Sequence, residues 1–281
     1  YSYNITENIP GKIIDRPMKF IKLKIKINKL EKSFKNIITN LNIICAINGI
    51  QDSIKVKCNF WNYLDIDPKK NLFSQSSNIE LFNFIKDAKN KKIIIPKGTH
   101  LINQDIFIPD NYTVICGGGT KIILNNNSTI FSSSNFEFIG NESEPIIVTS
   151  LDSTGQGIFI KNSNYKSTFK HTFFNNLNNP FKNNWNLTGA LTFYEADVDF
   201  NHCIFDKNFN GDDYLNIIRS NFEIINSKFI NINADAFDSD FSNGNIINSN
   251  FVNCGNDGID ISGSILTVRD VTMDGIKDKG L

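Results

Sequence analysis

The chain has 281 residues, and its 29 Lys plus Arg balance 29 Asp plus Glu, so the formal net charge is zero at pH 7. Without an excess of basic residues we expect no nucleic acid partner. No apolar run approaches the ~20 residues of a membrane-spanning helix, so we expect no membrane span. The length allows one or two domains with a large buried core.

Residues 1–70 are expected to form a small β-rich module. Residues 19–27 alternate lysine with apolar side chains, which is typical of a strand with one solvent-exposed face. Residues 36–46 and 53–61 also have β character, which favours an antiparallel arrangement. We interpret the lysine row as a solvated face or a protected edge strand rather than as a polyanion site.

Residues 71–92 are expected to form a linker and a short capping helix. Asn78 can cap the start of a helix over 78–88, in which Leu81, Phe82, Ile85 and Ala88 fall on one face. A solenoid must cover its open end, because exposed backbone groups and apolar side chains there promote aggregation. This helix is therefore predicted to cover the first coil.

A repeat of 22 residues dominates the rest of the chain. The Asp residues at 213, 235 and 257 are 22 apart, and Asn216, Asp238 and Asp260 keep the same step. Short β-type runs separated by turn residues, with a period in the twenties and no helical periodicity, predict a parallel β-helix. We expect an all-β fold, with coils of about 22 residues over 93–281, and further repeats or another domain attached to this fragment.

Alternation along the strands assigns side chains to the two faces of each strand. One inward column reads Leu191, Leu215, Phe237, Ile259, and a second reads Phe174, Phe205, Phe229, Phe251, Met273. A polar corner column reads His171, His202, Asn226, Asn248, Asp270. The insertion 178–188, which carries Trp185, is expected to project as a loop, where ligand contacts concentrate.

The five cysteines, Cys45, Cys58, Cys116, Cys203 and Cys254, include no CxxC pair. We expect buried free thiols rather than a metal site. The glycine run 117–119 is not followed by the Lys-Ser of a phosphate loop, and it predicts a tight corner.

The outward columns contain the candidate site. Adjacent coils lie ~4.8 Å apart and alternate residues of a strand ~6.6 Å apart, so Asp238, Asp240 and Asp260 are predicted to form one cluster. Carboxylates this close need either a raised pKa or a bound cation, for which Ca²⁺ is the candidate. Asp is disfavoured in mid-strand, which favours a function for these three residues.

Other residues extend the candidate site. Asn216 and Tyr194 lie on the outward columns and, with Trp185, are candidate substrate-binding residues. Arg219 is a candidate catalytic residue, and Glu195 occupies the equivalent position on the neighbouring coil, so the two are expected to pair. Asp213, Asp235 and Asp257 precede strands, where a structural role in bonding their own turn backbone is sufficient.

The coil phrases resemble those of a known superfamily. The region from Ile93 to the end resembles the right-handed parallel β-helix superfamily that includes pectate lyases and polygalacturonases. The phrases 213–220, 235–241 and 256–263 resemble poorly characterised bacterial β-helix proteins, some of which carry a spore-coat-kinase-like domain. The resemblance implies a right-handed β-helix and an extracellular, cell-surface or periplasmic location, but no firm reaction.

Two functions remain open from the sequence. The first is binding or processing of a polysaccharide. A hydrolase would use two of Asp238, Asp240 and Asp260 as acid and base, whereas a lyase would hold a cation on them, with Arg219 or Tyr194 as base. The alternative is a non-catalytic structural or adhesion scaffold attached to another domain.

Overall fold

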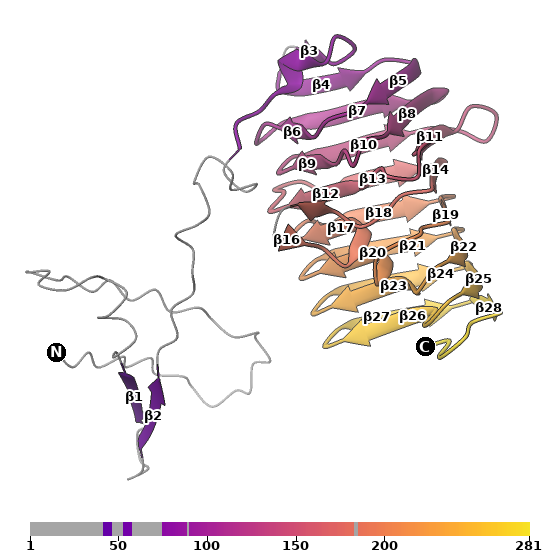
Figure 1. The fold of residues 1–281 in the computed structure, drawn as a ribbon. Helices are drawn as coiled ribbons and strands as arrows, with labels where there is room; N and C mark the ends of the chain where they lie inside the picture. The colour runs from indigo at the N-terminus through magenta and orange to yellow at the C-terminus, as the bar shows by residue number, and fades with distance from the viewer. Residues whose placement is uncertain (1–41, 47–52, 58–74, 89, 183–184) are drawn as a thin grey trace, which may run out of the picture. The chain divides into compact units, whose positions relative to one another are not determined.

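The computed structural model describes residues 42–46, 53–57, 75–88, 90–182 and 185–281 (Figure 1). The chain divides into two compact units, Tyr1–Ser74 and Gln75–Leu281. In the first unit, β1 (Asn42–Ala46) and β2 (Ser53–Lys57) pair antiparallel. This pair confirms the strands expected within 36–46 and 53–61; the lysine-rich run 19–27 lies outside the described residues.

The second unit is a parallel β-helix in which each complete coil contributes one strand to each of three sheets (Figure 1). The last coil contributes to two of the sheets only, and one antiparallel strand extends the largest sheet at its first edge. The seven-stranded sheet consists of β6 (Ile106–Ile108), β9 (Ile130–Ser132), β12 (Ile158–Lys161), β17 (Gly189–Tyr194), β20 (Asp213–Ile218), β23 (Asp235–Asp240) and β26 (Ile259–Ser262). The eight-stranded sheet consists of β5 (Gly98–Ile102), β8 (Thr120–Leu124), β11 (Ile146–Thr149), β14 (Thr172–Asn175), β19 (Ile204–Asp206), β22 (Lys228–Ile232), β25 (Asn250–Cys254) and β28 (Thr272–Asp274). The nine-stranded sheet consists of β3 (Lys86–Ala88), β4 (Lys92–Ile95), β7 (Thr113–Gly117), β10 (Asn135–Ile139), β13 (Ser167–Lys170), β18 (Val198–Asn201), β21 (Asn221–Ile225), β24 (Asn243–Ile247) and β27 (Ile265–Arg269).

The register confirms the 22-residue coil. Asn216 pairs with Asp238, and Asp238 pairs with Asp260, so each strand lies one repeat above the strand before it. The glycine run forms the predicted tight corner, with Gly119 at φ 75° between β7 and β8. Strands β5 and β9 were not expected from the sequence, because Thr, His and Ser interrupt their apolar pattern.

The helix predicted over 78–88 is wrong. The structure has a 3-10 helix η4 (Ile79–Leu81) followed by β3, which pairs antiparallel with β4. Asn78 caps no helix: its Nδ2 donates to the backbone oxygen of Asp105 at 2.8 Å, and its Oδ1 accepts the N–H of Phe107 at 2.8 Å. These bonds to the first coil override the helical pattern, as tertiary contacts commonly do.

The segment nevertheless covers the first coil. Phe82 is 7% exposed and belongs to the core cluster, whereas Leu81, expected on the same buried face, is 61% exposed. Among the described residues no helix is long and apolar enough to cross a bilayer.

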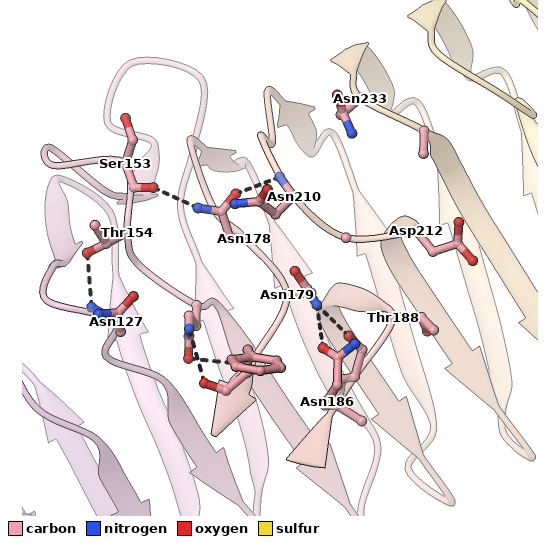
Figure 2. A pocket seen from close by; sticks show the side chains of 15 residues that line it. Asn127, Ser153, Thr154, Asn178, Asn179, Asn186, Thr188, Asn210, Asp212 and Asn233 are labelled. Carbon is pink, nitrogen blue, oxygen red and sulfur yellow. Dashed lines mark hydrogen bonds between the residues drawn. The ribbon is translucent and has the colours of Figure 1, made fainter. Parts of the chain in front are cut away.

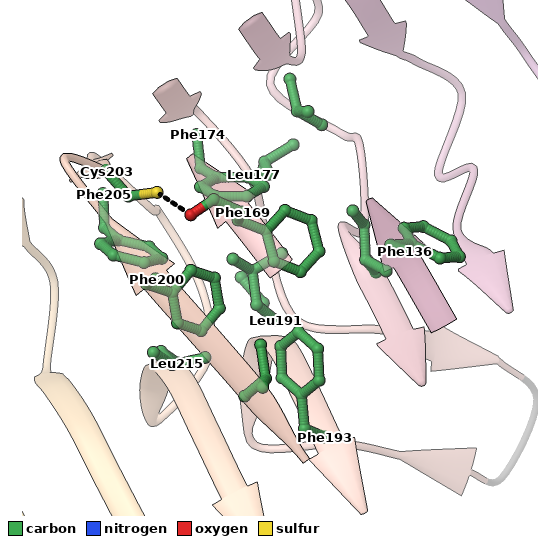
Figure 3. Packing of buried hydrophobic residues seen from close by; sticks show 14 of the residues in the cluster. Phe136, Phe169, Phe174, Leu177, Leu191, Phe193, Phe200, Cys203, Phe205 and Leu215 are labelled. Carbon is green, nitrogen blue, oxygen red and sulfur yellow. Dashed lines mark hydrogen bonds between the residues drawn. The ribbon is translucent and has the colours of Figure 1, made fainter. Parts of the chain in front are cut away.

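Stacked side chains fill the interior, as the two inward columns predict. Phe174, Phe205, Phe229, Phe251 and Met273 lie in register on successive strands of the eight-stranded sheet. The rings of Phe205 and Phe229 are 4.3 Å apart and nearly parallel, and those of Phe229 and Phe251 are 4.7 Å apart. Figure 3 shows the start of this stack beside Phe169 and Phe200.

Buried thiols also belong to this interior. Cys116, Cys203 and Cys254 are buried and in no disulfide, as expected, and burial raises the pKa of each thiol to about 12. Cys58 and the side chain of Cys45 lie outside the described part of the chain.

The corners use left-handed backbone. The predicted polar column, His171, His202, Asn226, Asn248 and Asp270, has φ between 46° and 54°. Asn and Asp tolerate this region better than most residues, which explains their recurrence there. Along the column, Asn248 Nδ2 donates to Asn226 Oδ1 at 2.6 Å, and the rings of His171 and His202 stack at 4.8 Å.

Buried serines satisfy the backbone next to this corner. The Oγ of Ser227 donates to the backbone oxygen of Ile225 at 2.9 Å, and the N–H of Ser227 donates to Ser249 Oγ at 3.1 Å. Because Ser227 and Ser249 are fully buried, each hydroxyl replaces water for a backbone group that would otherwise lack a partner.

The insertion forms a short hairpin. β15 (Phe181–Lys182) and β16 (Trp185–Asn186) pair antiparallel. The ring of Trp185 lies 6.0 Å from that of Phe131 and 5.6 Å from that of Phe159, on the outer face of the seven-stranded sheet. The hairpin therefore packs against the solenoid, where the sequence predicted a projecting loop.

We expect Phe229→Ala to destabilise the protein by about 3–5 kcal/mol, because it removes one ring from a continuous buried stack. The free energy of unfolding is measured by chemical denaturation of the full chain. Tyr165→Ala, which removes a ring that is 66% exposed, is the control. Equal stability losses in the two variants would contradict the role of the stack.

Candidate functional site

One outward column of the seven-stranded sheet changes character along the solenoid. In register it reads Phe107, Phe131, Phe159, Thr192, Asn216, Asp238, Asp260. The hairpin covers its aromatic half, where Phe131 and Phe159 are 6% and 5% exposed. In the acidic half, the described part of the chain leaves Asp238 and Asp260 half-buried.

Asn216 holds Asp238 in place. Its Nδ2 lies 2.9 Å from Asp238 Oδ2, 3.0 Å from Asp213 Oδ2 and 3.0 Å from Thr188 Oγ1. The side chain is buried, so its amide nitrogen is engaged within the protein. The sequence predicted that Asn216 binds substrate. In the structure its side chain instead positions the carboxyl of Asp238.

Asp238 is the most strongly perturbed carboxyl of the site. Burial, reinforced by the neighbouring carboxyls of Asp213, Asp240 and Asp260, raises its pKa to about 8. Its Oδ1 is buried and has no hydrogen-bond partner among the described residues. Asp238 therefore holds a proton at neutral pH, which is one of the two outcomes expected for crowded carboxylates.

The other two acids lie beside it. Asp240 follows two residues along β23 on the same outward face, and burial is the main cause of its raised pKa. Asp260 is the in-register neighbour of Asp238 on the next coil, and its Oδ1 accepts the N–H of Ile261 at 2.8 Å. The register thus places Asp238, Asp240 and Asp260 next to one another on the outer face, as the 22-residue repeat predicted.

The described residues contain no group of three or more His, Cys, Asp or Glu side chains arranged to hold a metal ion. The geometry therefore gives no support to the Ca²⁺ site expected on Asp238, Asp240 and Asp260.

Arg219 interacts with Tyr194 at the corner after the sheet. Its Nη1 donates to the Tyr194 hydroxyl at 2.9 Å, and its guanidinium lies 5.7 Å from the centre of that ring. The expected pair with Glu195 is confirmed, with Nη1 3.5 Å from Oε1. A guanidinium carries N–H donors and no acceptor, so Arg219 can bind an anion or donate a hydrogen bond but does not suit the role of base.

The acids at or just before the start of each strand join successive coils. Asp235 Oδ1 accepts the N–H of Asp257 at 2.6 Å, and Asp257 Oδ1 accepts the N–H of Lys279 at 2.9 Å. The sequence predicted a structural role for this column through bonds to each residue's own turn. The role is structural for these two, but the backbone that they bind belongs to the next coil.

A pocket of about 850 Å³ lies at the corner that leads into the seven-stranded sheet (Figure 2). Its lining includes Asn, Ser, Thr and Gln side chains together with Phe181 and Leu187 of the hairpin segment. Thr188, which lines it, is the residue bonded to Asn216, so the pocket adjoins the acidic column. The sequence analysis did not predict this pocket. The feature that could have indicated it is the run of polar corner residues beside the insertion.

Fold and site together define a parallel β-solenoid with an acidic outer face beside a polar pocket. No protein-family model matches the chain, and the comparisons with curated proteins and with solved structures gave no match.

The raised pKa of Asp238 predicts a pH-dependent stability. The pKa of an Asp in the unfolded chain is ~3.9, whereas the pKa of Asp238 in the fold is about 8. The stabilisation from its proton is therefore complete below pH ~4 and is lost as the pH rises to about 8. The slope of the unfolding free energy against pH due to Asp238 cannot exceed ~1.4 kcal/mol per pH unit, which is the value for one proton. Because Asp238 is partly exposed to solvent, the observed slope should be smaller.

We expect Asp238→Asn to flatten the wild-type profile between pH 5 and pH 9, as measured by chemical denaturation at a series of pH values. Asp270→Asn, at an exposed corner away from this sheet, should leave the profile unchanged. A profile in Asp238→Asn identical to the wild type would show that Asp238 titrates normally.

Proposed function

We propose that this protein binds and processes polysaccharide on the outer face of the seven-stranded sheet, as a member of the right-handed, pectin-lyase-like β-helix superfamily. The observation that carries the proposal is Asp238, a mid-strand carboxyl with a pKa of about 8 beside two further carboxyls. An acid and a base held close together with separated pKa values are what glycoside cleavage requires.

Hydrolysis is the reaction that the residues suit best. The protonated carboxyl of Asp238 would donate its proton to the glycosidic oxygen as that bond breaks. The backbone of Asp260 lies one coil away, at the ~4.8 Å spacing of adjacent strands, which allows the ~5 Å carboxyl separation of a retaining enzyme. The backbone of Asp240 lies ~6.6 Å away along the strand, which allows the larger separation at which a base activates water in an inverting enzyme.

A lyase is less well supported. Elimination from a uronate needs its carboxylate neutralised, commonly by a cation, and a base at the adjacent carbon. The described residues offer no metal-binding group of three ligands. Of the two expected bases, the Arg219 side chain carries only hydrogen-bond donors, and the Tyr194 hydroxyl accepts a hydrogen bond from Arg219 at 2.9 Å.

We further propose an extracellular, cell-surface or periplasmic location, with the solenoid attached to further repeats or another domain. Polysaccharide outside the cell is the substrate that such a surface would meet. A solenoid suits an extended ligand, because its stacked coils repeat the same outward positions at ~4.8 Å intervals.

One observation favours the second candidate, a non-catalytic scaffold. The bond from Asn216 to Asp238 joins two coils, and further side-chain bonds join coils at Asp235 and Asp257. Acidic side chains that bond one coil to the next can have the sole role of holding the coils of the solenoid together. The two functions can be separated by substituting Asp238: an enzyme would lose its general acid and its activity, whereas a scaffold has no activity to lose.

We expect Asp238→Asn to reduce cleavage of a susceptible polysaccharide by ~10²–10⁴-fold, because the general acid is lost. Products released by the full chain from neutral and acidic polysaccharides are identified by mass spectrometry, and Asp270→Asn is the control. Saturated fragments that disappear only in Asp238→Asn support hydrolysis. No cleavage of any substrate by the wild type would favour the scaffold, whereas cleavage that persists in Asp238→Asn would show that Asp238 is not the general acid.

A further inference from the structure

We propose that the corner pocket binds an uncharged segment of the polysaccharide, so that the substrate is a neutral glycan rather than a polyuronate. We name it the amide pocket and define it by Asn127, Gln156, Asn179, Phe181, Asn210 and Asn233. This inference rests on the proposed function for the identity of the ligand, but its own evidence lies outside the acid cluster.

The amide pocket is built by five successive coils. Asn127, Gln156, Asn179, Asn210 and Asn233 come from consecutive corners at this edge of the solenoid, and the hairpin forms one wall (Figure 2). Its volume of about 850 Å³ lies in the range of small-ligand sites, ~300–1,000 Å³, and suits a few sugar units. A site that crosses several coils fits an extended ligand.

Several amides of this pocket are available to a ligand. The side chains of Asn127, Asn210 and Asn233 are exposed and make no hydrogen bond to another described residue. Each amide offers two donors and an acceptor, which match hydroxyl groups that both donate and accept. Asn178 at the rear is buried and fixed: it donates to the Ser153 backbone oxygen at 2.7 Å and accepts the N–H of Asn210 at 3.0 Å.

The hairpin supplies an apolar surface. Phe181 lines the pocket with 61% of its surface exposed, and Leu187 lies nearby. The backbone of Phe181 is held by Gln156, whose Oε1 accepts its N–H at 3.3 Å. An exposed aromatic ring beside hydrogen-bonding amides complements a sugar ring, which has an apolar C–H face and a polar rim.

Charge distinguishes between glycan classes. Among the described residues that line the pocket, Asp212 is the only ionisable one, and none is Lys or Arg. Lys182 of the hairpin reaches the pocket wall, where its Nζ bonds the backbone oxygen of Asn127, but it is already paired with Asp105, whose Oδ1 lies 2.7 Å away. A uronate would lose hydration without gaining an unpaired cation and would face the acidic side chain of Asp212, whereas a neutral sugar has no such cost.

The pocket connects to the acidic column through one residue. Thr188 lines the pocket, and its hydroxyl oxygen accepts a hydrogen bond from Asn216, which also bonds Asp238. A glycan seated in the amide pocket could therefore extend along the outer face toward Asp238. The pocket would select the sugar, and the acids would act on a neighbouring linkage.

The test measures the binding of trisaccharides to the full chain. Calorimetry gives the affinity, and NMR of the asparagine side-chain amides reports on the pocket. The probes are maltotriose, cellotriose and mannotriose as neutral ligands and trigalacturonate as the acidic ligand. We expect at least one neutral probe to bind at least tenfold more tightly than trigalacturonate. Phe181→Ala and Asn233→Ala should each weaken that binding by about fivefold or more, whereas Tyr165→Ala should not.

Asn233→Ala keeps the test decisive if Phe181→Ala disturbs the hairpin, because the Asn233 side chain makes no bond to another described residue. Tighter binding of trigalacturonate, binding unchanged in both pocket variants, or no binding of any probe would overturn the inference.

The variant Asp238→Asn separates this inference from the proposed function. Neutral glycan bound by wild type and variant alike, but cleaved by neither, would uphold the pocket and overturn catalysis. Cleavage of a polyuronate that requires Asp238 would uphold catalysis and overturn the neutral-glycan pocket.

Discussion

The structure depends on in-register stacking of one coil upon the next. Each side chain is placed above its equivalent ~4.8 Å away, so a residue that suits a position in one coil must also suit its neighbours. Phe205, Phe229 and Phe251 satisfy this inside, with nearly parallel rings. At the corners, left-handed backbone and hydroxyls such as Ser227 Oγ allow the chain to turn without leaving buried backbone groups unpaired.

The same stacking creates the chemistry of the outer face. A repeated position that carries a carboxylate forces like charges together: Asp238 is in register with Asp260, and the carboxyls of Asp213 and Asp240 also act on it. The repulsion and the partial burial are relieved by a proton on Asp238, and the bond from Asn216 keeps that carboxyl in place. A solenoid can thus hold a proton donor on a rigid surface without any loop having to close over it.

Much of the fold follows from the sequence because the 22-residue period places residues in space. The periodicity alone predicts that Asp238 lies beside Asp260, and that Glu195 lies close enough to Arg219 to pair with it. Features outside the period could not be predicted this way. The apolar pattern of 78–88 resembles a helix, but Asn78 bonds to the first coil instead. The pocket also escapes prediction, since its walls combine corners from five coils with an insertion that breaks the repeat.

The most direct test of the account is a crystal structure of the full-length Asp238→Asn variant with a neutral oligosaccharide. The account predicts a glycan that lies along the outer face of the seven-stranded sheet, with one end in the amide pocket. A glycosidic oxygen should then be within hydrogen-bonding distance of the side chain at position 238. A glycan bound on either of the other two sheets, or none bound when the ligand is in large excess, would contradict it.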